Sequence, residues 1–304
     1  YSNCDCSISD NLIYYHRCFG KEGIAVDLNG LITQLEQMPS RPVIGLALAG
    51  GSAYGIAHIG VLRYLEEISM PIDLIAGTSA GAAAGAVWAS GFSSEAMYEI
   101  VKSTDWWFLA KPVAFKSGLM SSKGIADWIN RLIGSKDFVE LNKPFAATAT
   151  NFATGELVVL KEGLVAEAVR ISCSLPGIYQ PVEYNGLQLV DGGLVQNLPV
   201  GVCRSLGADF VIAVDLHANL ESKKPRTVML SLIHAGNILQ RQHELVQVQL
   251  ADVVIQPQLG RLNPFNFRAV DKYVDLGYAA AQSAADQLKQ MITQILQHQH
   301  SNPN

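Results

Sequence analysis

Residues 74–90 read LIAGTSAGAAAGAVWAS and contain the pattern that decides the fold. The apolar run at 74–76 is short and is typical of a buried strand, and Gly77 ends it. Alanine-rich sequence with high helix propensity begins directly after Ser79 and continues to about Ser90. We therefore predict a strand, a tight turn and a helix in immediate succession, with Ser79 in the turn.

The turn itself, Gly77-Thr78-Ser79-Ala80-Gly81, has the form G-x-S-x-G in the strand-turn-helix context that a nucleophile elbow requires. Small residues at Gly77 and Gly81 allow the chain to fold back without a side-chain clash. Ser79 would be exposed at a helix N-terminus, where backbone N–H groups and the helix dipole favour developing negative charge. A chance match in a segment rich in glycine and alanine is the alternative, but the flanking strand and helix favour a nucleophile.

A second glycine-rich turn lies upstream of this elbow. The apolar run 43–48 predicts a buried strand, the turn follows at residues 49–55, and apolar residues then recur at helical spacing. Glycines allow backbone N–H groups to approach a ligand closely, so Gly50, Gly51 and Ser52 are candidates for an oxyanion hole. A plain strand-to-helix turn is the structural alternative, and neither of the two common phosphate-binding glycine patterns is present.

The chain downstream continues the alternation of strands and helices, which predicts an α/β fold with a parallel sheet. We expect further strands at residues 145–150, 156–160, 187–190, 210–215 and 253–256. Apolar residues that recur four and three apart predict one final helix with a single apolar stripe, formed by Val274, Tyr278, Ala281, Ala285, Leu288, Ile292 and Ile295.

Asp191 is the candidate base for Ser79. A serine needs a base to become a nucleophile. Asp191 follows the strand expected at 187–190 and precedes Gly192 and Gly193, so it would stand at the start of a loop rather than inside a strand. An ordinary turn aspartate is the alternative interpretation, because Asp-Gly is common in turns.

Together, the glycine turn, the G-x-S-x-G elbow and Asp191-Gly192-Gly193 resemble, in this order, the motifs of the patatin-like phospholipase family. The block 171–182 before the aspartate is also similar, and the resemblance spans about residues 43–216. The chain resembles the compact bacterial members of that family. The resemblance implies a three-layer α/β/α sandwich with a mostly parallel central sheet.

The resemblance also implies an activity and the residues that carry it. The function would be that of a serine-dependent lipid acyl hydrolase, of the phospholipase A, lysophospholipase or carboxylesterase type, which works through an acyl-enzyme and needs no cofactor. Ser79 would be the nucleophile, Asp191 its only partner, and the backbone of Gly50, Gly51 and Ser52 the oxyanion hole. A lipid or ester substrate would bring the protein into transient contact with a membrane surface.

The glycine turn departs from the family pattern at two positions. Ser52 stands where the family usually has glycine, and Tyr54 stands where it usually has a basic residue. Ser52 keeps its backbone N–H, so an oxyanion hole can survive. Loss of the cation at Tyr54 supports the alternative of a non-catalytic protein of the same fold that binds or regulates. The presence of Ser79 and Asp191 favours an enzyme.

An α/β-hydrolase esterase with a histidine-containing triad is a further alternative. His217, His234 and His243 all follow Asp191, so the chain order Ser, Asp, His is satisfied. Ser79 follows only two expected core strands, whereas that fold presents several before its elbow. We therefore prefer a Ser79–Asp191 dyad to a triad that contains a histidine.

Composition limits the classes of partner and the domain organisation. The chain has 304 residues, a net charge of −5 and 16% charged residues, and it lacks the clustered basic face that nucleic-acid binding requires. We expect an N-terminal arm over residues 1–40, one acyl hydrolase domain over 41–297 and a disordered tail over 298–304.

Two long uncharged stretches, 42–62 and 74–94, raise the question of membrane spans. Both contain too much glycine, serine and threonine for insertion, so buried strand-turn-helix units explain them better. The five cysteines do not form an even disulfide framework, which favours the cytoplasm, with contact to the membrane at its periphery.

Two further clusters and one histidine have a functional and a structural interpretation. Cys4, Cys6, His16 and Cys18 have ligand types that suit zinc, but the C-x-C spacing is tighter than usual and favours unpaired cysteines. His58 is expected to be a packed core histidine. The aromatic segment after it forms either a lid that touches lipid or core packing under a loop: Trp106, Trp107, Phe108, Leu109 and Phe115, with Lys111 and Lys116 nearby.

Overall fold

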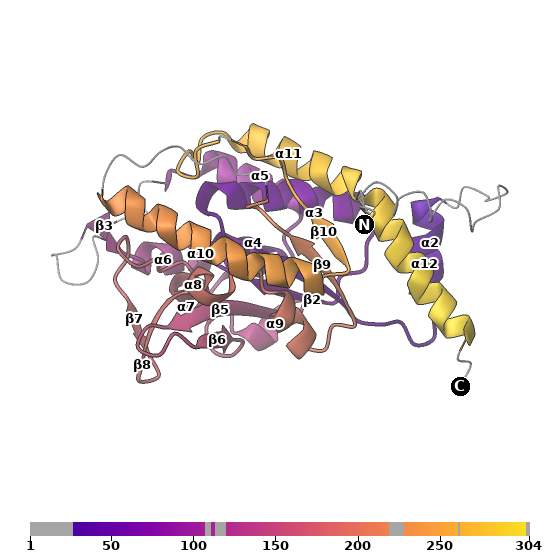
Figure 1. Cartoon of the computed structure of the whole chain (residues 1–304), viewed down its shortest axis with the longest axis horizontal. Coiled ribbons are helices and arrows are strands. Elements are labelled where there is room, and N and C mark those ends of the chain that lie inside the picture. The colour runs from indigo at the N-terminus through magenta and orange to yellow at the C-terminus, as the bar shows by residue number, and fades with distance from the viewer. Residues whose placement is uncertain (1–26, 107–110, 113–119, 219–227, 261, 302–304) are drawn as a thin grey trace, which may run out of the picture.

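One central sheet organises the molecule, which we describe from a computed structural model over residues 27–106, 111–112, 120–218, 228–260 and 262–301 (Figure 1). The strand order is β10-β9-β1-β2-β5-β8-β7, and β6 pairs with β5 off this path. The eight strands are β1 (Ile44–Leu48), β2 (Leu74–Gly77), β5 (Phe145–Asn151), β6 (Leu157–Leu160), β7 (Val182–Tyr184), β8 (Leu187–Asp191), β9 (Phe210–Val214) and β10 (Val253–Ile255).

The sheet has a parallel and an antiparallel part. The five strands β10, β9, β1, β2 and β5 are parallel, whereas β6 and β8 run antiparallel to β5, and β7 runs antiparallel to β8. The predicted strands are all present, and the expectation of a mostly parallel sheet is confirmed. Two features were not predicted: the strand β7, and a separate two-stranded ribbon formed by β3 (Lys111–Pro112) and β4 (Met120–Ser121).

Helices cover both faces of the sheet. They are α2 (Leu28–Glu36), α3 (Ala57–Glu67), α4 (Ala80–Ala89), α5 (Ser94–Ser103), α6 (Lys123–Ile133), α7 (Val165–Ser172), α8 (Gly193–Gln196), α9 (Val200–Ser205), α10 (Val228–Leu250), α11 (Val270–Ser283) and α12 (Ala285–Ser301), with short 3-10 turns η2 (Ser52–Ile56) and η4 (Phe138–Glu140).

The direction of the crossovers assigns these helices to layers. The connections β1-α3-β2 and β2-α4-β5 step across the sheet in one direction, and β9-α10-β10 steps in the other. Because such crossovers are right-handed, α3 and α4 lie on one face and α10 on the opposite face. α9 packs on β1, β2 and β9, and α11 packs against α3 (Figure 1). The predicted three-layer α/β/α architecture is confirmed.

The contact between α3 and α11 is unusually close because glycine stands on both sides. A Cβ atom at Gly60 would overlap the Val274 carbonyl oxygen, and a Cβ at Gly277 would overlap the Ala57 carbonyl oxygen. Backbone therefore touches backbone here, directly behind the turn η2. His58 lies fully buried in the same helix, as expected for a core histidine.

Three features at the chain ends differ from expectation. The predicted final helix is two helices, α11 and α12, divided at Ala284. α12 continues to Ser301, so the tail expected to be disordered from residue 298 is helical up to that point. Part of the predicted arm is also folded: Leu31, Ile32 and Leu35 of α2 are buried, and α2 packs on α12. None of the helices in the described ranges is both long and apolar enough to cross a bilayer.

Gly277→Ala should lower the free energy of unfolding by about 3 kcal/mol, because the added methyl group must displace the α3 backbone. Gly30→Ala is the matched control in a helix: nothing lies within 4 Å of its Cβ position, so it should raise the free energy of unfolding by about 0.5–1 kcal/mol. Urea denaturation followed by circular dichroism measures both. Equal stability of the two variants would contradict the close helix contact.

Candidate active site

Ser79 stands on a strained turn between β2 and α4. Its backbone has φ 53° and ψ −119°, a left-handed conformation that L side chains rarely adopt. The turn is possible because Gly77 and Gly81 have no Cβ: one at Gly77 would lie 2.5 Å from the Gly81 carbonyl oxygen, and one at Gly81 would overlap the Leu48 carbonyl oxygen. This is the geometry of a nucleophile elbow.

Hydrogen bonds hold this elbow on two sides. The Ser79 N–H donates to the Ser172 hydroxyl at 2.8 Å, which ties the turn to the end of α7. The Thr78 hydroxyl donates to the Gln196 carbonyl oxygen at 3.0 Å and lies 2.6 Å from the Thr148 hydroxyl. The strained turn is thus fixed by the Ser172 and Thr148 side chains and by the Gln196 backbone, as persistent backbone strain requires.

The register of the sheet brings Asp191 to the level of Ser79. Gly77 pairs with Ala147 of β5, and Asp191 pairs with Ala149 of the same strand. Two residues beyond Gly77 is Ser79, so both side chains reach the same edge of the sheet. The Asp191 N–H donates to the Ser174 carbonyl oxygen at 3.0 Å, which joins the aspartate to the segment after α7.

The Asp191 carboxylate is buried, with 4% of the residue exposed. Burial raises its pKa to about 6, although the Gly193 N–H, which donates to Oδ1 at 2.7 Å, and the nearby Ser79 side chain both favour the ionised form. A carboxylate with a raised pKa is a stronger base than an ordinary aspartate. The structure therefore brings the two predicted dyad residues together and makes Asp191 suited to accept a proton.

The glycine turn lies against Ser79, but its three candidate donors are not equivalent. A Cβ at Gly50 would lie 3.1 Å from the Ser79 Cβ. The Gly50 N–H already donates to the backbone carbonyl oxygen of Asn197 at 3.2 Å, so Gly50 is the least available of the three, and its role as an oxyanion donor stays a prediction. Within the described residues, the N–H groups of Gly51 and Ser52 have no partner and stay available.

Ala80 offers a further donor that the sequence interpretation missed. It is the first residue of α4, directly after Ser79, and its N–H has no acceptor among the described residues. The residue after a nucleophile often contributes to an oxyanion hole. The pattern G-x-S-x-G contained this information, since any residue at the fourth position supplies a backbone N–H at the helix start.

Tyr54 anchors the glycine turn from the outside. Its hydroxyl donates to the Leu262 carbonyl oxygen at 2.7 Å, and its ring packs edge-to-face on Tyr273 at 6.1 Å between centroids. Burial raises the pKa of the phenol to about 12, so it stays neutral. The Ala53 N–H donates to the Pro264 carbonyl oxygen at 2.9 Å. The residue in place of the usual cation thus has a structural role in holding the turn.

Histidines lie near the turn without contacting the dyad. His58 Nε2 donates to the Ala49 carbonyl oxygen at 2.8 Å, and burial lowers the pKa of the imidazole to about 4, so it is neutral. His217 Nδ1 donates to the Glu244 carboxylate at 2.7 Å. The described hydrogen bonds of both rings therefore go to groups other than Ser79 and Asp191, which disfavours a triad through either.

Cys173 is a neighbour of the dyad whose place the sequence did not reveal. Burial, and then the negative charge of Asp191, raise the pKa of its thiol, and a hydrogen bond with the Ser79 side chain only partly offsets this. The thiol is protonated at neutral pH and is a poor nucleophile. Cys173 belongs to the block 171–182 that resembles the family, but the sequence of this block could not show which side chain faces Ser79.

Several predicted candidates fall outside this site. Cys4, Cys6, His16 and Cys18 lie outside the described residues, as do Trp107, Phe108, Leu109, Phe115 and Lys116, and the side chain of Lys111 is likewise not described. The described ranges contain no cluster of three or more potential metal ligands. The Trp106 ring stacks on Phe267, with 4.6 Å between ring centroids, and packs on Trp128, with 5.6 Å between centroids. For Trp106, these contacts fit core packing under a loop.

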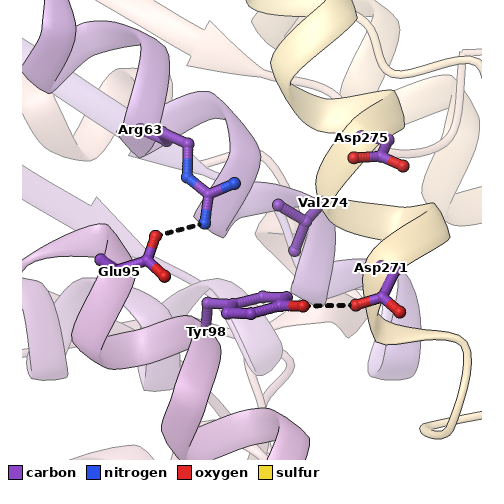
Figure 2. Close-up of a pocket in the computed structure, with 6 residues that line it drawn as sticks. All are labelled: Arg63, Glu95, Tyr98, Asp271, Val274 and Asp275. Atoms are coloured by element: carbon purple, nitrogen blue, oxygen red, sulfur yellow. Dashed lines mark hydrogen bonds and ion pairs between the residues drawn. The ribbon is translucent and has the colours of Figure 1, made fainter.

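A polar hollow of about 230 Å³ lies on the outer surface of α3, α5 and α11 (Figure 2). Two contacts join its lining side chains: Arg63 pairs with Glu95 at 2.8 Å, and the Tyr98 hydroxyl donates to Asp271 at 2.6 Å. None of its lining residues belongs to the elbow, the glycine turn or the Asp191 segment. It offers no nucleophile and is separate from the site described above.

The chain belongs to the patatin-like phospholipase family. The model of that family matches residues 46–204, more than half of the chain, and this range contains the glycine turn, Ser79 and Asp191. The expected family is therefore confirmed.

Three similar proteins illustrate the range of the likeness. A lysophospholipase NTE1 of Meyerozyma guilliermondii is 31% identical over 68% of this chain and 15% of its own length. An uncharacterised NTE family protein of Mycobacterium bovis is 34% identical over 59% of this chain and 51% of its own length. The crystal structure of VipD from Legionella pneumophila aligns with a TM-score of 0.48 and 14% identity, over 81% of this chain and 67% of VipD. The chain thus spans at most about half the length of these two sequence relatives.

Asp191→Asn should stabilise the protein at neutral pH. Because burial raises the pKa of Asp191 from its ordinary value of 3.8 to about 6, the folded state binds the proton more tightly than the unfolded chain. The free energy of unfolding therefore falls as the pH rises from about 4 to 6, and the full decrease is present above pH 6. We expect Asp191→Asn to raise the free energy of unfolding at pH 8 on the order of 2 kcal/mol, with no gain near pH 4.

Denaturant unfolding at pH 4, 6 and 8 measures this difference. Asp275→Asn, which alters an exposed aspartate, is the control and should change the free energy of unfolding by less than about 0.5 kcal/mol. An Asp191→Asn variant less stable than the wild type at pH 8 would show that burial of the ionised carboxylate does not destabilise the folded protein.

Proposed function

We propose that this chain is a serine-dependent lipid acyl hydrolase with a Ser79–Asp191 dyad. The observation that carries the proposal is a serine at φ 53° beside a buried aspartate whose pKa is raised to about 6. Membership of the patatin-like phospholipase family supports a lipid ester as substrate. The name of the fungal relative supports a lysophospholipid as the first candidate.

The proposed reaction has two acyl-transfer steps. Asp191 accepts the Ser79 hydroxyl proton while Oγ attacks the ester carbonyl carbon, and the N–H groups of Gly51, Ser52 and Ala80 stabilise the oxyanion. The ester C–O bond then breaks, the alcohol leaves with the proton from Asp191, and an acyl-Ser79 ester remains. Water, deprotonated by the same carboxylate, attacks the acyl carbon; the bond between Oγ and the acyl carbon breaks, the fatty acid leaves, and the proton on Asp191 passes to Oγ and restores the hydroxyl.

A non-catalytic role is the alternative that Tyr54 first suggested. Tyr54 holds the glycine turn through Leu262 and Tyr273, so its presence accounts for an anchored turn rather than for a lost function. Nothing about a binding scaffold would require a buried aspartate of raised pKa beside a strained serine. We therefore place the enzyme first.

Hydrolysis of lysophosphatidylcholine and of a soluble p-nitrophenyl ester tests this proposal. Ser79→Ala and Asp191→Asn should each lower kcat by at least about 10³-fold, whereas Ser283→Ala, which alters an exposed serine of α11, should keep wild-type activity. The wild-type kcat/KM should rise with pH through about 6, because only the ionised Asp191 accepts the proton. Full activity of Ser79→Ala would contradict the proposal.

We also propose that α10 is the surface that meets the lipid aggregate. Among its 23 residues, only Arg241 and Glu244 are formally charged, and both point inward. Apolar side chains face solvent instead: Ile238, Leu239, Leu245, Val246 and Leu250, with Leu239 67% and Val246 56% exposed. The helix adjoins the site, since Gln240 Nε2 lies 3.2 Å from the Cβ position of Gly193.

Leu239→Glu with Val246→Glu should weaken binding to phosphatidylcholine vesicles at least about fivefold, because charged carboxylates resist transfer into the interface. Hydrolysis of the soluble ester should not change. Val139→Glu is the matched control, since Val139 is 89% exposed and belongs to η4, outside α10. Co-sedimentation with vesicles measures the binding, and unchanged binding of the double variant would refute this assignment of the surface.

A further inference from the structure

A cluster of buried charges lies behind the glycine turn, outside the proposed dyad. Asp215, directly after β9, and Glu244, on α10, are 0% and 1% exposed. Arg241 joins them: its guanidinium donates to both oxygens of Asp215 at 2.9 Å and to Glu244 Oε2 at 3.1 Å. The cluster connects the end of a central strand to the inner face of α10.

The ionised state of this cluster follows from its partners. Burial alone would raise the pKa of Glu244, but hydrogen bonds from His217, Asn197 and Arg241 outweigh it and hold the pKa below its ordinary value. Burial would lower the pKa of Arg241, whereas Asp215 and Glu244 raise it. Glu244 and the Arg241 guanidinium are therefore charged at neutral pH, although both lie in or near the core.

Asn197 connects this cluster to the glycine turn through hydrogen bonds. Its Nδ2 donates to Glu244 Oε1 at 2.5 Å and to the Gly50 carbonyl oxygen at 3.3 Å. The backbone carbonyl oxygen of Asn197 accepts the Gly50 N–H at 3.2 Å. Both backbone polar groups of Gly50 are thus bound by one residue, whose amide is oriented by Glu244.

The Asn197 side chain also fills the space between the two halves of the site. A Cβ at Gly50 would overlap Asn197 Oδ1, and a Cβ at Gly193 would lie 3.0 Å from the same oxygen. Gly50 precedes the free N–H groups of Gly51 and Ser52, and Gly193 donates to the Asp191 carboxylate. Asn197 therefore contacts both the glycine turn and the loop that orients the base.

A buried ionic cluster is an expensive way to stabilise a core. Replacement of such clusters by packed apolar residues is often neutral or stabilising, because desolvation offsets the attraction. What the charges supply is fixed geometry: Arg241 orients Glu244, which in turn orients the Asn197 amide. An oxyanion hole needs such fixed geometry, because donors that must reorient during the reaction lose much of their effect.

We propose that Asn197, held by the buried Asp215–Arg241–Glu244 cluster, is the positioning residue of the glycine turn. Asn197 fixes Gly50 so that the Gly51 and Ser52 N–H groups stay beside Ser79. This inference rests on the proposed function, because it assigns a role in that same site. Asn197 and the cluster contact neither substrate nor the reacting atoms, and act through the backbone of the turn.

Asn197→Ala and Glu244→Gln test the inference on the soluble p-nitrophenyl ester. Donors that stabilise only the transition state change kcat and leave KM nearly constant. We expect kcat to fall about 10–100-fold, with KM within about threefold. The pH midpoint near 6 should stay unchanged, because Asp191 and the Gly193 N–H that donates to it are both retained. Glu244→Gln is the variant expected to fold, since it keeps the size of the side chain while it loses the charge and one of the two acceptor oxygens.

Two comparisons separate positioning from a general loss of stability. Asp73→Asn breaks a partly buried ion pair in which Arg41, before β1, donates to Asp73, before β2, at 2.5 and 2.7 Å. It should lower the thermal midpoint and leave kcat unchanged. Arg241→Lys should recover part of the kcat that Arg241→Met loses, because the ammonium group retains a charge beside Asp215 and Glu244.

Kinetics are measured at a temperature at which circular dichroism shows every variant folded. A kcat within twofold of wild type in Asn197→Ala and Glu244→Gln would overturn the inference. So would a loss of kcat in Asp73→Asn as large as in Glu244→Gln. Absence of hydrolysis by the wild-type protein would instead overturn the proposed function, and this inference with it.

Discussion

The contact between two strand-to-helix turns, at the ends of β1 and β2, is the constraint on which the rest of the structure depends. The register pairs Leu48 with Gly77, so the glycine turn and the elbow leave the sheet at the same level. No Cβ fits at Gly81, because it would overlap the Leu48 carbonyl oxygen. Only this absence of side chains lets the elbow that carries Ser79 and the glycine turn at Gly50 lie close together.

Other parts of the fold hold these turns from every side. Ser172 accepts the Ser79 N–H, Asn197 binds both polar groups of Gly50, and Tyr54 ties the glycine turn to Leu262. Asp191 reaches the same edge from an antiparallel strand. The site is thus assembled from segments far apart in sequence, and its strained and buried groups are stable only because the sheet and both helix layers support them.

Much of this arrangement could be predicted from local sequence, and the reason is physical. Apolar runs ended by glycine define β1 and β2, and G-x-S-x-G requires a tight turn whichever helix packs behind it. Long-range pairing was not predictable in the same way. No local pattern shows that Gly50 has its N–H bound by Asn197, that Cys173 faces Ser79, or that Arg241 and Glu244 of α10 turn inward while Leu239 faces solvent. Ala284 divides the last helix although the apolar stripe continues through it.

Covalent labelling with a fluorophosphonate, followed by peptide mapping, tests most directly whether Ser79 is an activated nucleophile. The account predicts one adduct, on the peptide that contains Ser79, which disappears in Ser79→Ala and forms more slowly in Asp191→Asn. A folded wild-type protein that takes up no label, or an adduct on another residue such as the neighbouring Cys173, would contradict it.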